Sequence, residues 1–184
     1  EYTNSSKIGQ TLDVFEIDEN TLKRIEESTV SDIEKIFNLI KSIEKTVELQ
    51  RNNAPYLISI AEKAELLVKL FENRQKTTKE TLEGLKEITE EINTAQKEQK
   101  EKSMSSEIFT IYRLLKEEGL NKAETIANQM NEVLITYPHW KENESYEREV
   151  RAKLYQVIIG SGIKDTKKVS EIVQNIMKIL EGSR

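Results

Sequence analysis

Apolar side chains recur at intervals of three and four residues along most of this 184-residue chain. This spacing places side chains on one face of an α-helix, because the helix turns once every 3.6 residues. With only 2 Pro and 6 Gly to interrupt it, the pattern favours long helices over many-turned β structure. It predicts an all-α fold. One predicted buried stripe, in residues 31–51, contains Ile33, Ile36, Phe37, Ile40, Ile43 and Val47.

Helix start and stop signals divide the pattern into about eight helices. Ser31 with Glu34, and Thr77 with Glu80, have the spacing of a capping box, in which two side chains satisfy free amides at a helix start. Only residues 11–17 hint at a strand. The predicted helices cover about residues 19–27, 31–51, 55–73, 77–95, 105–118, 121–136, 140–159 and 165–180.

A fully polar run, QKEQKEKS, follows Ala95 and reads as a solvated helix extension or a hinge. We therefore expect residues 1–104 to form an elongated antiparallel helical bundle whose first 18 residues are irregular. Residues 105–184 are expected to form a compact subdomain of four helices.

Charge and cysteine content exclude several functions. The chain has 28 basic and 33 acidic residues, so its net charge of -5 gives no overall attraction to nucleic acid, although a local basic patch can exist. With no cysteine, disulfides, thiolate catalysis, iron–sulfur clusters and cysteine zinc sites are excluded. No apolar run reaches the roughly 18 residues that a membrane span needs. We expect a cytoplasmic protein without membrane contact.

Catalytic motifs are missing from the sequence. No phosphate-binding loop and no dinucleotide-binding turn occurs, and a single histidine, His139, rules out a site with two His ligands. His139 is expected to be a structural loop residue. The many carboxylates alternate with lysines on polar helix faces, as a solvated surface requires. The sequence therefore predicts that this chain is not itself an enzyme and holds no cofactor or metal.

Trp140 and three basic residues are the candidates for a binding site. Trp140, the sole tryptophan, is expected to anchor the core, and an exposed docking position is the alternative. Arg148, Arg151 and Lys153 lie along one predicted helix. They form either a surface paired with neighbouring glutamates or a contact with a phosphate backbone or an acidic partner.

Three segments resemble the C-terminal helical region of the R subunit of type I restriction enzymes. They read ENRQKTTKETLEGLKEITEEI, IFTIYRLLKEEGL and HWKENESYEREVRAKLYQVIIGSGI, and the resemblance covers roughly residues 55–180. Trp140, Arg148, Arg151 and Leu154 match the family's pattern of a tryptophan followed by an arginine-bearing helix. Arg74, with Thr77 or Thr78, matches an arginine-containing turn.

The resemblance implies a function larger than this chain. Such R subunits cleave DNA and pump it with ATP, so the parent protein would use ATP and Mg, yet no nuclease or motor residues occur here. The C-terminal region would dock the motor subunit onto the methyltransferase and specificity subunits. Arg148, Arg151 and Lys153 would contact that partner or the DNA backbone. The chain, which lacks an initiator Met, is expected to be a monomeric piece of the parent.

Two other functions stay open. A free-standing adaptor could use Leu85, Ile88, Ile92 and Ala95 as a short coiled-coil seam. A small-molecule-binding bundle would instead need a sizeable cavity with convergent polar groups.

Overall fold

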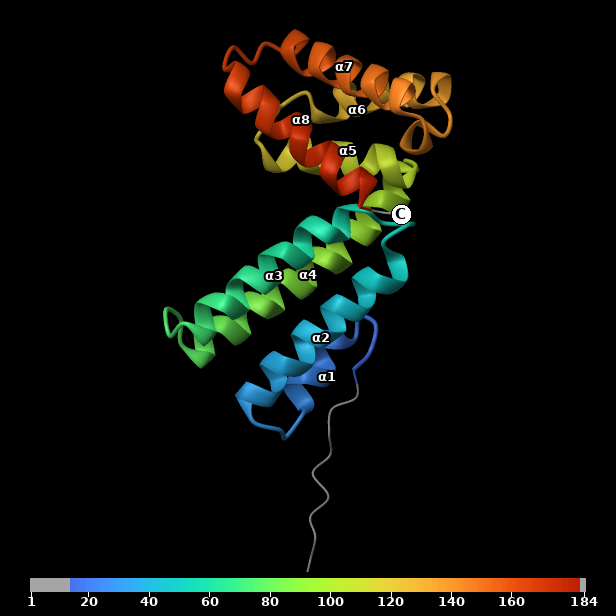
Figure 1. Cartoon of the computed structure of the whole chain (residues 1–184). Coiled ribbons are helices and arrows are strands. Elements are labelled where there is room, and N and C mark those ends of the chain that lie inside the picture. The colour runs from blue at the N-terminus through green and yellow to red at the C-terminus, as the bar shows by residue number, and fades with distance from the viewer. Residues whose placement is uncertain (1–13, 183–184) are drawn as a thin grey trace, which may run out of the picture. The chain divides into compact units, whose positions relative to one another are not determined.

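A computed structural model describes residues 14–182 of the chain, and this part is all-α (Figure 1). It contains eight α-helices, one short 3-10 helix and no strand, which confirms the predicted fold class. The elements are α1 (Thr21–Glu27), α2 (Asp32–Gln50), α3 (Tyr56–Glu72), α4 (Thr78–Lys102), α5 (Ser106–Glu117), α6 (Ala123–Thr136), η1 (Trp140–Glu142), α7 (Glu144–Gly160) and α8 (Thr166–Glu181).

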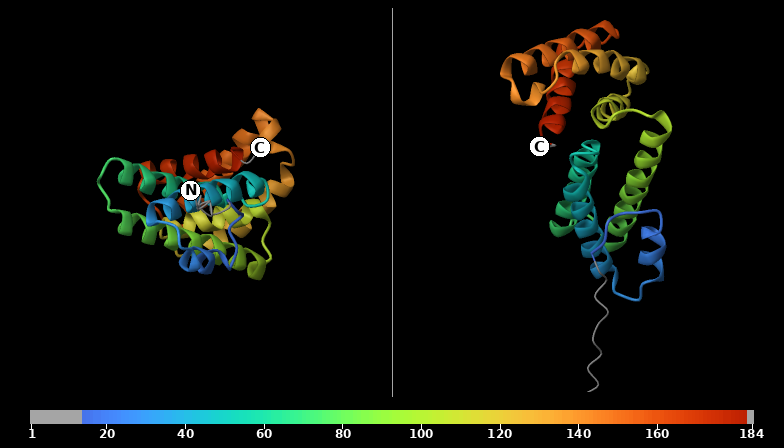
Figure 2. Two further views of the ribbon diagram at one scale, coloured as in Figure 1. Left: turned by 90° about the horizontal axis from the view of Figure 1, so that it is seen from below. Right: turned by 90° about the vertical axis from the view of Figure 1, so that its right-hand side faces the viewer.

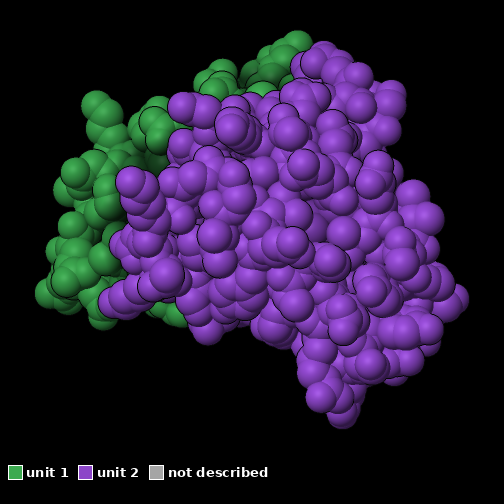
Figure 3. Space-filling model, turned by 90° about the horizontal axis from the view of Figure 1, so that it is seen from above, with its two compact units in different colours: residues 1–48, 60–94 green, residues 49–59, 95–184 purple. Residues whose placement is uncertain are grey.

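The helices fall into two compact units, which Figure 3 shows in different colours. Of the described residues, unit 1 holds 14–48 and 60–94, and unit 2 holds 49–59 and 95–182. The turn between α2 and α3 therefore belongs with α5 to α8, although it lies far from them in the sequence. The predicted division at residue 104 stays a prediction.

In unit 1, α3 and α4 run side by side in opposite directions (Figures 1 and 2). Gly84 of α4 lies so close to α3 that a Cβ atom added there would be 2.6 Å from Leu67 Cδ2. Lys63 Nζ of α3 also pairs with Glu91 Oε1 of α4 at 2.9 Å. Because glycine has no side chain, the side chain of Leu67 can occupy the space beside Gly84.

An extended segment before α1 lies against α2 without forming a strand. The amide of Ile17 donates to Thr46 Oγ1 at 2.7 Å, and the amide of Phe15 donates to Ser42 Oγ at 3.3 Å. Because side-chain hydroxyls satisfy these amides, no neighbouring strand is needed. The predicted strand is wrong for residues 14–17, and residues 11–13 lie outside the described part.

Helix α2 buries a stripe that differs from the predicted one. Ile33 and Phe37 were expected in the core, but they are 49% and 45% exposed. Ser42 and Thr46 lie in the buried stripe instead, because their hydroxyls accept hydrogen bonds from the amides of the extended segment. The buried residues of α2 are Ile36, Leu39, Ile40, Ser42, Ile43 and Thr46.

Both predicted capping boxes are confirmed. The Ser31 amide donates to Glu34 Oε2 at 2.9 Å, and the Glu34 amide donates to Ser31 Oγ at 3.3 Å. The corresponding distances for Thr77 and Glu80 are 2.8 Å and 3.2 Å. These reciprocal bonds satisfy amides that the first helical turn leaves unpaired, and so they fix where α2 and α4 begin.

In unit 2, four helices form a closed arrangement (Figure 2). Helix α5 packs on α6, α6 on α7, α7 on α8, and α8 packs back on α5. The α2–α3 turn joins them, since the Tyr56 ring meets Phe109 of α5 edge to face at 4.9 Å. Arg51 donates a hydrogen bond to the carbonyl of Gly182. The core of unit 2 therefore includes Tyr56, although it lies far from α5 to α8 in the sequence.

Candidate functional site

The loop between α6 and α7 holds the only tryptophan and the only histidine. His139 is exposed and left-handed, with a φ of 57°. Trp140 opens η1 and is 3% exposed. Lys141 Nζ lies 5.7 Å from the centre of the Trp140 ring and pairs with Glu107 Oε1 at 2.7 Å. Trp140 is therefore a core residue, as predicted, and His139 is a loop residue.

Helix α7 begins at Glu144, four residues later than predicted. Asn143 Oδ1 accepts hydrogen bonds from the amides of Ser145 at 2.9 Å and Tyr146 at 3.2 Å. Because Asn143 caps α7, Trp140 lies in the separate helix η1, and the prediction of one helix over residues 140–159 is wrong at its start. An asparagine ahead of acidic residues is the sequence signal that marks this boundary.

The predicted contact residues of α7 do not form one patch. Arg151 Nη2 lies 2.7 Å from Glu147 Oε1 and 3.2 Å from Glu181 Oε1, so Arg151 ties α7 to α8. Lys153 lies about 160° around the helix from Arg151, because each residue turns α7 by about 100°. Its Nζ donates to Gln156 Oε1 at 3.3 Å. The contact role of these residues stays a prediction.

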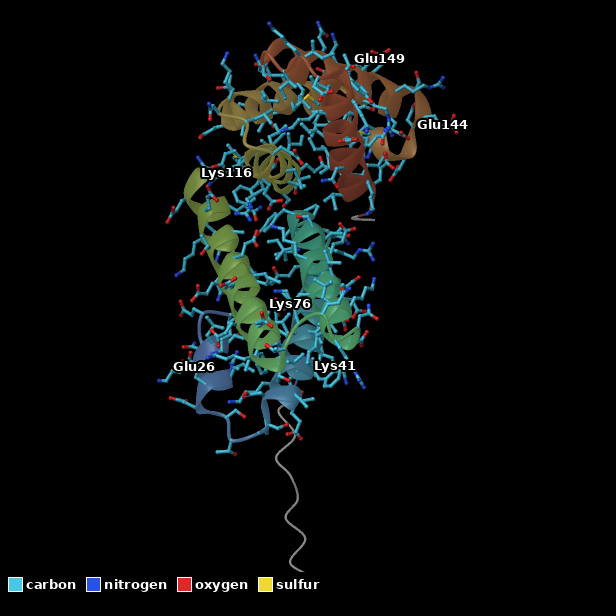
Figure 4. The ribbon with its side chains drawn as sticks, turned by 90° about the vertical axis from the view of Figure 1, so that its left-hand side faces the viewer. Glu26, Lys41, Lys76, Lys116, Glu144 and Glu149 are labelled. Atoms are coloured by element: carbon cyan, nitrogen blue, oxygen red, sulfur yellow. The ribbon has the colours of Figure 1, made fainter. Side chains whose placement is uncertain are left out.

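Arg148 is more exposed than Arg151. Its side chain is 76% exposed against 34% for Arg151, and its Nη2 lies 4.0 Å from Glu144 Oε2 at the start of α7. Figure 4 marks Glu144 and Glu149 on this helix. An exposed ion pair of this kind contributes little free energy, so Arg148 can turn toward a partner at small cost.

The other family-pattern residues have structural positions. Leu154 is 1% exposed and lies in the core of unit 2. Arg74 ends α3 in a left-handed conformation with a φ of 58°. The Gln75 amide donates to the Leu70 carbonyl at 2.8 Å, and the Arg74 amide donates to the Phe71 carbonyl at 2.9 Å. This pair of bonds is the Schellman motif, which normally has glycine where this chain has Arg74.

A charged cluster that the sequence pattern did not predict lies between α4 and α5. Glu98 Oε1 accepts hydrogen bonds from Tyr112 Oη at 2.7 Å and Lys116 Nζ at 2.8 Å, and Arg113 Nη1 lies 3.8 Å from Glu98 Oε2. Figure 4 marks Lys116. The polar run after Ala95 is therefore a continuation of α4 whose residues bind α5. The spacing of these residues indicates the cluster, since Glu98 and Lys102 follow Ala95 at helical intervals and so lie on the same face of α4.

The same cluster shifts two ionisation equilibria. Burial raises the pKa of Glu98, but hydrogen bonds from Lys116 and Tyr112 outweigh it and hold that pKa below its ordinary value. The hydrogen bond to Glu98 raises the pKa of Lys116. Nearby, burial raises the pKa of Tyr56 to about 12, although Arg113 opposes the shift. The cluster thus favours the charged forms of Glu98 and Lys116.

A surface cleft of about 440 Å³ lies between α6 and α7. Most of its polar lining residues are uncharged, and Lys122 is the one cation in the set. Within residues 14–182, no group of three or more His, Asp or Glu residues could hold a metal ion. The cleft is lined by Lys122, Thr125, Ile126, Gln129, Gln156, Val157, Gly160 and Ser161.

Exposed apolar side chains mark another part of unit 2. The rings of Tyr137 and Tyr146 pack 5.4 Å apart where α6 ends and α7 begins, and Tyr146 is 39% exposed. Ile135, two residues before Tyr137, is 71% exposed. Tyrosine is common among the residues that dominate protein–protein binding energy. We call Tyr137 and Tyr146 the tyrosine pair.

Comparison with known proteins gives one distant relative for most of the chain. The chain is 23% identical, over 189 aligned residues, to a Methanocaldococcus jannaschii protein named "Putative type I restriction enzyme MjaIXP endonuclease subunit". The alignment covers 92% of this chain but 18% of that protein, so the chain spans about a fifth of its relative's length. No family model and no solved structure matches. The chain is thus distantly similar to a restriction endonuclease subunit.

None of the helices in the described range has the length and apolar content to span a membrane.

Proposed function

We propose that this chain is a helical docking module of a type I restriction endonuclease subunit. It would join that subunit to the methyltransferase and specificity subunits in the cytoplasm. The observation that carries the proposal is the similarity to an endonuclease subunit along 92% of the chain. The earlier resemblance, reached from Trp140, Leu154 and the arginines, leads to the same class of enzyme.

The tyrosine pair supports a docking role for unit 2. Tyr137 directly follows α6 and Tyr146 is on α7, and these two helices belong to the closed arrangement, so the aromatic surface needs no reordering before a partner binds. Arg148 is on the same helix as Tyr146 but about 160° around it, and it is exposed enough to add a charged contact on the other side of α7. We assign the contact with the partner subunits to Tyr146 and Arg148, and regard Arg151 as a residue that positions α7.

Binding to the purified cognate methyltransferase–specificity core tests this function. The whole chain should be captured by the core, and Tyr146→Ser combined with Arg148→Ala should weaken capture by about tenfold or more. Ile159→Ser is the matched control, since Ile159 is 51% exposed at the far end of α7. Absence of capture by the unmutated chain would refute the docking role. Equal losses in both variants would move the contact away from Tyr146.

The parent's DNA cleavage and its use of ATP and Mg are proposed for the rest of the subunit. This chain is proposed to act by binding, as a monomer outside its complex. Sedimentation equilibrium would test that state.

The coiled-coil alternative lacks a free seam. Leu85, Ile92 and Ala95 are fully buried and Ile88 is 9% exposed, so the chain covers this seam itself.

The small-molecule alternative needs free polar groups inside the helices. Two buried hydroxyls show where such groups go instead, since Thr89 Oγ1 donates to the Leu85 carbonyl at 2.9 Å and Thr110 Oγ1 to the Ser106 carbonyl at 2.7 Å. Neither alternative gains support.

A further inference from the structure

The turn that joins α3 to α4 gathers basic residues in a chain that is acidic overall. We call residues 69–80 the α3–α4 tip. The tip contains four basic residues, Lys69, Arg74, Lys76 and Lys79, and two acidic residues, Glu72 and Glu80. Residues 73–79, which form the turn and the first two residues of α4, carry three positive charges and no negative charge. The tip therefore has a local charge opposite to that of the whole chain.

One of the two acids is already committed to local structure. Glu80 Oε2 accepts hydrogen bonds from the amide and the hydroxyl of Thr77, at 2.8 Å and 2.7 Å. The hydrogen bonds from Thr77 lower the pKa of Glu80, and the nearby charge of Lys76 adds to this effect. Glu80 is thus held by Thr77 at the start of α4, although it stays exposed.

The cations of the tip differ from many other cations of the chain. Elsewhere, Arg151 lies between two glutamates, Lys102 pairs with Glu124 at 2.7 Å, and Lys168 lies near Glu118. For Lys69, Arg74 and Lys79, no ion pair occurs among the described residues, and all three are exposed. Their charges therefore remain available to a partner.

The backbone fixes where the cations of the tip lie. Helix α4 begins at Thr78, and the capping box of Thr77 and Glu80 fixes this start. The Schellman motif holds Arg74 at the outer end of α3, in a left-handed backbone conformation that glycine usually adopts. Figure 4 marks Lys76 in the same turn. Fixed backbone and exposed cations thus present one positive surface.

We propose that the α3–α4 tip binds the sugar-phosphate backbone of double-stranded DNA. Contacts to phosphate come typically from Arg and Lys, from Asn, Gln and Thr side chains, and from helix N-termini. The sequence NRQKTTK, residues 73–79, supplies basic and polar side chains of these kinds. It contains no apolar residue, whereas a protein interface is built around a buried apolar or aromatic centre. The ligand class is therefore a polyanion rather than an acidic protein surface.

This site is separate from the docking role assigned to α7. It lies in unit 1, uses other residues, and reads no base sequence, because phosphate contacts carry no sequence information. It would give the module a second ligand besides its protein partners.

Fluorescence anisotropy with a labelled duplex of about 30 base pairs, in the low-salt range where phosphate contacts are strong, tests the proposal on the whole chain. The test variant is Arg74→Gln with Lys76→Gln and Lys79→Gln. The matched control, Lys41→Gln with Lys97→Gln and Lys164→Gln, makes the same change in net charge at exposed lysines elsewhere. Circular dichroism and urea unfolding check that both variants fold.

The unmutated chain should bind with an affinity that falls steeply with salt. The test variant should lose roughly eightfold in affinity per contact at about 0.1 M salt, and its log–log salt slope should shrink by about 0.9 per contact. The control should retain most of the affinity and the slope. Equal losses in test and control, or no binding by the unmutated chain, would overturn the proposal. Competition by poly-glutamate as strong as that of DNA would show a site for acidic polypeptides instead.

The docking proposal and the DNA-binding proposal can be refuted independently of each other. The test variant should still be captured by the methyltransferase–specificity core, and the Tyr146→Ser, Arg148→Ala variant should still bind DNA.

Discussion

Arg151 of α7 reaches Glu181, the last residue of α8, with its Nη2 nitrogen 3.2 Å from the Glu181 carboxylate. The same nitrogen lies 2.7 Å from Glu147, one turn earlier on α7. One guanidinium thus holds two carboxylates on two helices, and the neighbouring Arg148 holds only one exposed carboxylate of its own helix.

This difference predicts unequal effects on stability. Arg151→Met should lower the free energy of unfolding by about 1 kcal/mol, because it leaves two carboxylates close together without their cation. Arg148→Met should change it by less than about 0.5 kcal/mol. Urea denaturation followed by circular dichroism measures both. A loss from Arg148→Met as large as that from Arg151→Met would contradict the assigned roles.

Replacing Arg74 with glycine should stabilise the chain. Glycine adopts the left-handed conformation of Arg74 without steric cost, and the gain of about 1–2 kcal/mol is reduced by the larger entropy of glycine in the unfolded chain. We expect a net gain of roughly 0.5–1 kcal/mol. The control Glu72→Gly, inside the last turn of α3, should destabilise by about 1 kcal/mol. If Arg74→Gly destabilises, a contact of its side chain outweighs the backbone cost.

The Glu98 cluster predicts a dependence of stability on pH. Because the folded state holds the pKa of Glu98 below its ordinary value of 4.5, the charged carboxylate stabilises the fold above that value. This contribution is lost as the pH falls through the lowered pKa. Glu98→Gln should therefore be destabilising near neutral pH, by about 1–3 kcal/mol for a charge-assisted network, and closer to the unmutated chain at about pH 3.

Tyr112→Phe provides a second test of the Glu98 cluster. It removes one hydrogen bond to Glu98 and should cost about 1 kcal/mol at neutral pH. Urea unfolding across the acidic range measures both variants. A cost of Glu98→Gln that does not change with pH would contradict the assigned role of its charge.

Trp140 should report on the folding of unit 2. Trp140→Ala should cost about 3–5 kcal/mol, because it empties a large buried volume. Trp140→Phe should cost less than about 1.5 kcal/mol, since it keeps most of the ring and removes an indole N–H that has no hydrogen-bond partner among the described residues. Circular dichroism during urea unfolding compares them. Equal costs would show that the anchor depends on the indole nitrogen.

Most of the fold was accessible from the sequence because helix formation depends on local signals. The capping boxes at Ser31 and Thr77 predicted where two helices start, and the structure contains the reciprocal hydrogen bonds. Asp165 likewise caps α8, accepting from the amides of Lys167 and Lys168. A cap needs only neighbours within three residues, so sequence alone identifies it.

The errors arose where a distant part of the chain decides the outcome. Ile33 and Phe37 fit the helical period, but the extended segment 14–17 requires the hydroxyls of Ser42 and Thr46. The polar run after Ala95 looked solvated because its partners Tyr112 and Lys116 belong to another helix. At the candidate site, the sequence identified Trp140 as a core residue. It gave no sign that Arg151 faces α8 while Lys153 points away.

The closed arrangement of α5, α6, α7 and α8 has a consequence for how a ribosome makes this protein. Helix α5 needs α8 to cover its apolar face, and α8 is the last of the four to be synthesised. During translation, the apolar side chains of α5 that α8 covers must therefore stay exposed, or be held by a chaperone, until some sixty more residues have emerged. A chain that ends before α8 would leave these side chains of α5 exposed.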